Sequence, residues 1–223
     1  MSAMDRVGAF SGLAYVVLAN LGGALIGEGA SGAGSPGQQI LDEQQRYAEN
    51  PWTNVAFAVI IFAQLALMIF IGHLCARVRD AGWFATTALI GGATAMIANF
   101  ISVATVIAMF VLRDDISPEL ARALQDVDGA GHLVQLLPLE VFVLFASAAA
   151  LVTRSLGRVL SWGGIAIGAT SIVGLAATGL PATDEFFLWP FLLVLLWIAA
   201  VSLRLAFSRN RTATPAAVAA TAS

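Results

Sequence analysis

The stretch GHLVQLLPLEVFVLFASAAALVT, residues 131–153, decides the fold of this chain. It is long and apolar enough to cross a bilayer core, which takes about 20 helical residues. It also contains Glu140, the one acidic residue within an apolar run of the sequence, two residues after Pro138. The sequence therefore predicts a membrane-spanning helix that carries an ionisable group inside the bilayer.

Five further apolar runs predict five more spans. The composition is that of a membrane protein, because 59% of the 223 residues are hydrophobic and 11% are charged, whereas soluble domains are about 25% charged. The predicted fold class is all-α, a polytopic membrane helix bundle with six transmembrane helices in a single domain, residues 1–208. The six predicted spans are residues 7–27, 52–75, 83–112, 131–153, 159–180 and 186–207.

The two longest segments between the spans, residues 28–51 and 113–130, are predicted to be outer loops that each carry a short amphipathic helix. In the second loop, Ser117 is a suitable N-cap and Pro118 suits the first turn of a helix. The end of the chain, residues 209–223, is rich in alanine and threonine. This low-complexity tail is predicted to be disordered and cytoplasmic.

The arginines predict the orientation of the bundle, because cytoplasmic segments of membrane proteins are enriched in Lys and Arg. With a cytoplasmic N-terminus, three arginines fall in outer segments and eight in inner segments. Both termini are therefore predicted to be cytoplasmic, in a multi-pass protein of a bacterial inner membrane that has the lipid bilayer as its first partner. The inner arginines are Arg6, Arg77, Arg79, Arg154, Arg158, Arg204, Arg209 and Arg211, and the outer ones are Arg46, Arg113 and Arg122.

Polar residues inside the predicted spans form the candidate ligand-binding site. A charge at the bilayer centre costs about 2.5–3.5 kcal/mol on the mildest scale, and no arginine lies inside a span to pair with Glu140. This glutamate must therefore be protonated, hydrated or hydrogen-bonded. At about 1.5 Å per residue, the polar side chains all lie in the outer half of the bilayer or near its midplane. The candidate residues are Glu140, Gln135, Asn99, Gln64 and Asn20.

A metal site is a further hypothesis. Asp128 and His132 are four residues apart, which places both on one face of a helix together with Gln135. Two such ligands suit a metal ion, and Asp126 or Glu140 could add a third, but the outer segments contain no second histidine. The single cysteine excludes an internal disulfide and a cluster of cysteine ligands. No cofactor is predicted, and the lack of a basic patch with interleaved aromatic residues argues against nucleic acid as a partner.

Several stretches together resemble a family of small bacterial six-helix integral membrane proteins that is catalogued as a domain of unknown function (number 4386). They are RVGAFSGLAYVVL at residues 6–18, the long polar first outer loop, SPELARALQDVDGAGH at residues 117–132, and TRSLGRVLSWGGIAIGA at residues 153–169. The resemblance covers the chain up to about Arg204 and implies a six-helix topology. That family has no established activity, and Glu140 is not carried over from a family pattern, so the resemblance implies no mechanism.

The sequence favours a ligand-binding membrane protein, either a carrier or a receptor-like sensor, that holds a small amphipathic molecule in an outward-facing pocket around Glu140. One alternative is an accessory or scaffolding subunit with a membrane-protein partner, in which Glu140 hydrogen-bonds to Asn99 or Gln64 and ties helices together. Another is a metal-dependent hydrolase that uses Asp128, His132 and Glu140. An enzyme is the less favoured of these classes.

Overall fold

The computed structural model describes residues 3–27, 34–178 and 184–207, and these residues are 90% helical with no strand, as predicted. The predicted tail, residues 209–223, lies outside the described residues, as do residues 28–33 of the first predicted loop. The elements are α1 (Ala3–Ile26), α2 (Gly37–Glu49), α3 (Thr53–Arg77), the 3-10 helix η1 (Arg79–Ala81), α4 (Trp83–Leu112), α5 (Pro118–Thr153), α6 (Arg158–Thr178) and α7 (Asp184–Phe207).

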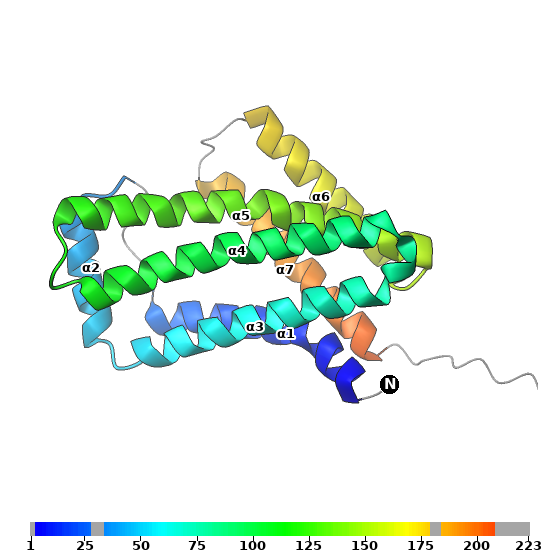
Figure 1. Ribbon diagram of the computed structural model, residues 1–223, viewed down its shortest axis with the longest axis horizontal. Helices are drawn as coiled ribbons and strands as arrows, with labels where there is room; N and C mark the ends of the chain where they lie inside the picture. The colour runs from blue at the N-terminus through cyan, green and yellow to red at the C-terminus, as the bar shows by residue number, and fades with distance from the viewer. Residues whose placement is uncertain (1–2, 28–33, 179–183, 208–223) are drawn as a thin grey trace, which may run out of the picture.

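Six of these helices, all except α2 and the three-residue η1, are long and apolar enough to cross a membrane, which confirms the predicted number of candidate spans. Most of them run along the long axis of the molecule, and α2 lies across one end (Figure 1). The rings of Phe10 in α1 and Phe207 in α7 have centroids 6.4 Å apart, so the start of α1 and the end of α7 lie together. They lie at the end opposite to α2, where η1 joins α3 to α4 (Figure 1). We call these two ends of the bundle the α2 end and the η1 end.

The helix α5 is longer than the sequence predicts. It runs without a break over 36 residues, Pro118–Thr153, so the short helix expected within residues 113–130 forms its first turns. Ser117 caps it by accepting a hydrogen bond from the backbone N–H of Leu120 at 3.3 Å, and the isolated glycines that follow weaken a helix without ending it. At 1.5 Å per residue, α5 is about 54 Å long against a hydrocarbon core of about 30 Å. The helix is therefore longer than a single crossing of that layer requires.

The helix α2 closes one end of the bundle by packing against α4 and α5. Its Ile40 is fully buried in a small apolar cluster with Met109 of α4 and Ala121 of α5. Gly37 lies directly against the backbone carbonyl of Pro118, where a side chain would not fit. An apolar contact and a close backbone contact thus fix α2 on the start of α5.

Polar contacts fix the other end of α2. The Tyr47 hydroxyl donates a hydrogen bond to the Glu43 carboxylate, and burial, followed by this hydrogen bond, raises the pKa of Tyr47 above its usual range. The Thr53 hydroxyl donates to the backbone carbonyl of Tyr47 at 2.6 Å, which joins the end of α2 to the start of α3. As a result, α2 is attached to α3 as well as to α4 and α5.

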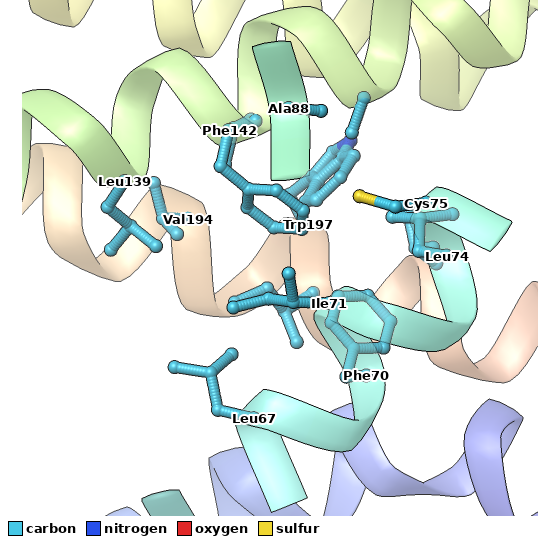
Figure 2. Close-up of a cluster of buried hydrophobic side chains, with 14 of the residues drawn as sticks. Leu67, Phe70, Ile71, Leu74, Cys75, Ala88, Leu139, Phe142, Val194 and Trp197 are labelled. Carbon is cyan, nitrogen blue, oxygen red and sulfur yellow. The ribbon is translucent and has the colours of Figure 1, made fainter. Parts of the chain in front are cut away.

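The main apolar core lies in the half of the bundle nearer to η1, where side chains of α3, α5 and α7 meet (Figure 2). Phe142 of α5 contacts the ring of Phe70 of α3 and the ring of Trp197 of α7, both edge-on. The ring centroids are 6.4 Å and 6.1 Å apart. Such edge-to-face pairs are a favoured geometry for buried aromatic rings, so this cluster holds three spans together.

Glycines bring α4 and α6 close to α5. A side chain at Gly91 of α4 would lie 2.8 Å from the carbonyl oxygen of Pro138, and one at Gly168 of α6 would lie 2.8 Å from the carbonyl oxygen of Glu140. Small residues at such crossings are typical of membrane helices, which pack through close backbone approach. From this crossing α6 leans away from the bundle towards the α2 end (Figure 1).

Candidate functional site

A cavity of about 280 Å³ lies between α1, α3, α4, α5 and α7, and we call it the central cavity. Ile26, the last residue of α1, and Phe57, near the start of α3, line it, which places it in the half of the bundle nearer to α2. Aliphatic and aromatic side chains make up much of its wall. Its polar residues are Tyr15, Gln64, Asn99, Ser102, Asp128, His132 and Gln135.

Hydrogen bonds between α4 and α5 order the polar wall of the central cavity. The side-chain amide of Asn99 donates to the Gln135 side-chain oxygen at 2.8 Å, and the Ser102 hydroxyl donates to the Asp128 carboxylate. Residues three and four apart share one face of a helix. This explains why residues 99 and 102 of α4 meet residues 128 and 135 of α5.

His132 completes this wall. Its Nδ1 lies 3.0 Å from the Ser102 oxygen, 3.0 Å from the backbone carbonyl of Asp128 and 3.4 Å from the Asp128 carboxylate. The His132 side chain is 61% exposed while that of Asp128 is 12% exposed. The His132 imidazole therefore lies at the exposed edge of the polar wall, and the Asp128 carboxylate lies deeper in the structure.

Two buried oxygens of the central cavity have no hydrogen-bond partner in the part of the chain that the structure describes. They are Oε1 of Gln64 on α3 and Oδ1 of Asn99 on α4. A buried polar atom without a partner costs about 1–3 kcal/mol. A molecule that brings N–H or O–H groups into the cavity would remove that cost, so these two oxygens favour a hydrogen-bond donor.

Glu140 is not among the residues that line the central cavity. It is 3% exposed and lines a second, much smaller cavity of about 20 Å³ between α5, α6 and α7, which we call the Glu140 cavity. The reason is helical geometry, because five residues turn the chain by about 140° between Gln135 and Glu140. The same helix thus presents Gln135 to α4 and Glu140 to the opposite side.

Asn20 does not line either cavity. Its side-chain amide donates to the backbone carbonyl of Val16 at 2.7 Å, within its own helix, and the side chain is exposed. Of the five predicted ligand-binding residues, the structure brings together Gln64, Asn99 and Gln135.

The proposed metal ligands Asp128 and His132 do lie side by side, 3.4 Å apart at their nearest atoms. Within the described residues, however, no group of three His, Cys, Asp or Glu side chains is placed to hold a metal ion. Glu140, one of the two candidates for a third ligand, faces the other cavity. Catalytic zinc sites use three protein ligands, so this pair does not fit one.

Sequence reasoning missed Ser102 and Tyr15. Ser102 is three residues after Asn99, which is a signal that both face the same way, but a single serine in a span usually bonds to its own backbone. Tyr15 lies in α1 and is 3% exposed in the wall of the central cavity. Nothing in its sequence position shows that it faces a cavity, because the helix that it faces depends on how the spans pack.

Comparison with known proteins adds no relative: no family model, no curated protein and no solved structure matches this chain. The site must therefore be interpreted from its own residues.

Proposed function

We propose that this protein binds a small amphipathic molecule in the central cavity and acts as a carrier or a receptor-like membrane protein. The observation that carries the proposal is the pair of unpartnered acceptors, Gln64 Oε1 and Asn99 Oδ1, in one cavity inside a bundle of apolar helices. A ligand with N–H or O–H groups and an apolar body would match both the acceptors and the wall. The volume of about 280 Å³ suits a small ligand, since typical sites enclose about 300–1,000 Å³.

The Asp128 carboxylate favours a ligand head that is neutral or positively charged over one that is negatively charged. Its hydrogen bond from Ser102 and its contact with His132 keep it in place on the cavity wall. If the α2 end is the outer end, as the arginines predict, the cavity lies in the outer half of the membrane. We therefore propose that the ligand enters from outside the cell, past α2 and the first turns of α5.

The first test compares three probes of equal chain length by their effect on the melting temperature of the detergent-extracted protein. Octylamine and octanol carry hydrogen-bond donors, whereas octanoate at neutral pH carries only acceptors. A ligand that binds only the folded state stabilises it by about 2.7 kcal/mol at 100 times its Kd. We expect octylamine and octanol to raise the melting temperature and octanoate to have no effect.

Two variants test whether the shift in melting temperature arises from binding in the central cavity. The double variant Gln64→Leu/Asn99→Leu removes both acceptors at similar side-chain volume and should lose the stabilisation. Asn20→Ala changes an amide that bonds within its own helix, and it should respond like the wild type. Equal shifts with all three probes, or an unchanged response in the double variant, would contradict the proposed site.

The alternative, an accessory or scaffolding subunit, is favoured by the exposure of α6. In an apolar stretch of 18 residues in α6, 17% of the residues are buried. The corresponding stretches of the other candidate spans are 28–44% buried. Gly163 has no atom within 4 Å of the position where a side chain would begin, so another helix could approach it closely. Native mass spectra of the gently extracted protein separate the two functions, because a co-purifying protein supports the subunit and a bound small molecule supports the carrier or receptor.

A further inference from the structure

We propose that Glu140 is a proton-binding site in its own right, separate from the central cavity and reached from the lipid side of the bundle between α5 and α6. Glu140 is 3% exposed, and the Ser171 hydroxyl is the hydrogen-bonding side chain within reach of its carboxyl group among the described residues. Apolar side chains line its cavity, and Ser171 of α6 is the polar residue in the wall. The site does not depend on the function proposed for the central cavity.

The elements around Glu140 bring no cation to pair with it. Helix α4 has no charged residue, and α6 has only Arg158 at its first position, more than three turns before Ser171. In α7, Arg204 is more than three turns beyond Pro190, the α7 residue of the cavity wall. The nearest acidic positions in sequence on α7 are Asp184 and Glu185, in its first turn. On α5 itself, the titratable groups nearest in sequence are Asp128 and His132, which line the central cavity.

An isolated carboxylate in such surroundings takes up a proton, because burial of an unpaired charge costs far more than burial of the neutral acid. The size of the cavity limits what else could neutralise it. A volume of about 20 Å³ holds about one water molecule. A divalent metal ion needs about six oxygen ligands, and the described wall offers Glu140 and Ser171 as polar side chains.

The placement of Glu140 at the edge of the bundle makes the lipid side the route of access. Leu137, which lines the same cavity, is 44% exposed, and Val173 on α6 is 67% exposed. Beyond the crossing at Gly168, α6 leans away from α5 (Figure 1). A small apolar reagent dissolved in the bilayer can therefore reach the carboxyl group along α6 without crossing the central cavity.

Dicyclohexylcarbodiimide tests these properties directly, because it partitions into membranes and reacts with protonated carboxyl groups. The acid proton moves to a carbodiimide nitrogen, and the carboxyl oxygen attacks the central carbon to give an O-acylisourea. This adduct rearranges to a stable N-acylurea that retains all atoms of both reactants. Labelling therefore adds the mass of one reagent to the peptide that contains Glu140.

With the full chain in lipid vesicles, we expect one label per chain at Glu140. Labelling should fall as pH rises, by about tenfold for each pH unit once the carboxyl group is mainly ionised. Glu140→Gln should abolish the label, whereas Asp128→Asn, which changes the carboxyl group of the central cavity, should retain it. Replacing choline chloride with sodium chloride in the buffer should not change the rate.

Three results would overturn the proposal. One is the absence of label at Glu140 at every pH from about 5 to 9, while the chain unfolded in dodecyl sulfate still reacts. Another is protection of Glu140 by sodium chloride, which would indicate a metal-cation site. The third is a label at Glu140 that is lost in Asp128→Asn, which would mean that the reagent arrives through the central cavity. A normal melting temperature for Glu140→Gln shows that the lost label does not come from unfolding.

Discussion

Ser102 is the residue that joins the two helices of the polar wall. Its hydroxyl donates to the Asp128 carboxylate and lies 3.0 Å from His132 Nδ1. Removal of this one oxygen leaves a buried carboxylate without that donor and an imidazole without one of its neighbours. A buried hydrogen bond to a charged group has a net value of about 1.5–3 kcal/mol, so the residue matters for stability as well as for the shape of the site.

We predict that Ser102→Ala lowers the free energy of unfolding by about 1–3 kcal/mol, because the Asp128 carboxylate loses a buried partner. Ser161→Ala is the matched control, since Ser161 is fully buried but its hydroxyl has no partner among the described residues. It should be neutral or slightly stabilising. The measurement is reversible unfolding in mixed micelles of mild detergent and dodecyl sulfate, and equal losses in both variants would refute the assigned role.

At the scale of the helix, the closest approach of α4 to α5 depends on Gly91. A side chain there would meet backbone atoms, the carbonyl oxygen of Pro138 at 2.8 Å and the amide nitrogen of Phe142 at 2.9 Å. Backbone atoms in a packed pair of helices cannot turn aside as a flexible side chain can. Gly91 therefore sets the distance between the two helices that build the polar wall.

We predict that Gly91→Ala destabilises the protein by about 1–3 kcal/mol, the usual cost of overpacking a core. Gly72→Ala in α3 is the control, because no atom lies within 4 Å of its added carbon. It should be neutral or stabilising, since glycine costs about 0.5–1 kcal/mol relative to alanine inside a helix. Unfolding in the same mixed micelles measures both, and a Gly91→Ala variant as stable as the wild type would contradict the close contact.

The helices illustrate what the sequence can predict and what it cannot. Runs of apolar residues gave the number of candidate spans, because length and hydropathy are local properties. The cap at Ser117 was also local and was predicted, but its continuation into the span was not, since no local signal requires a break or forbids one. Gln135 and Glu140 point to different sides of α5 because of the angle that five residues turn through in a helix. The helix that each of these side chains faces depends on how the spans pack together, and this packing cannot be predicted from the residue pattern of one sequence.

At the scale of the whole molecule, α2 is a separate piece that closes one end of the bundle. It is held by the buried Ile40, by the contact of Gly37 with Pro118 and by the hydrogen bond from Thr53 to Tyr47. Few contacts hold a short element, so its opening should require less free energy than global unfolding. It lies at the end of the bundle nearer to the central cavity.

We predict that Ile40→Ala speeds hydrogen exchange of the backbone amides of α2 by at least tenfold while α4 and α5 keep their protection. Truncation of a buried isoleucine to alanine typically costs about 2–5 kcal/mol, and here that loss falls on the attachment of one element. Ala48→Ser, at an exposed position of α2, should exchange like the wild type. Equal acceleration throughout the chain would show that α2 does not open as an independent unit.

The two cavities on opposite faces of α5 have a thermodynamic consequence. Gln135 and Glu140 belong to one rigid element, with Pro138 between them. Any change that protonation makes to the affinity of the central cavity must be matched by an equal change that the ligand makes to the affinity for the proton, because linkage between sites is reciprocal. In the proposed carrier, a coupling of this kind would let a pH difference across the membrane bias ligand uptake on one side.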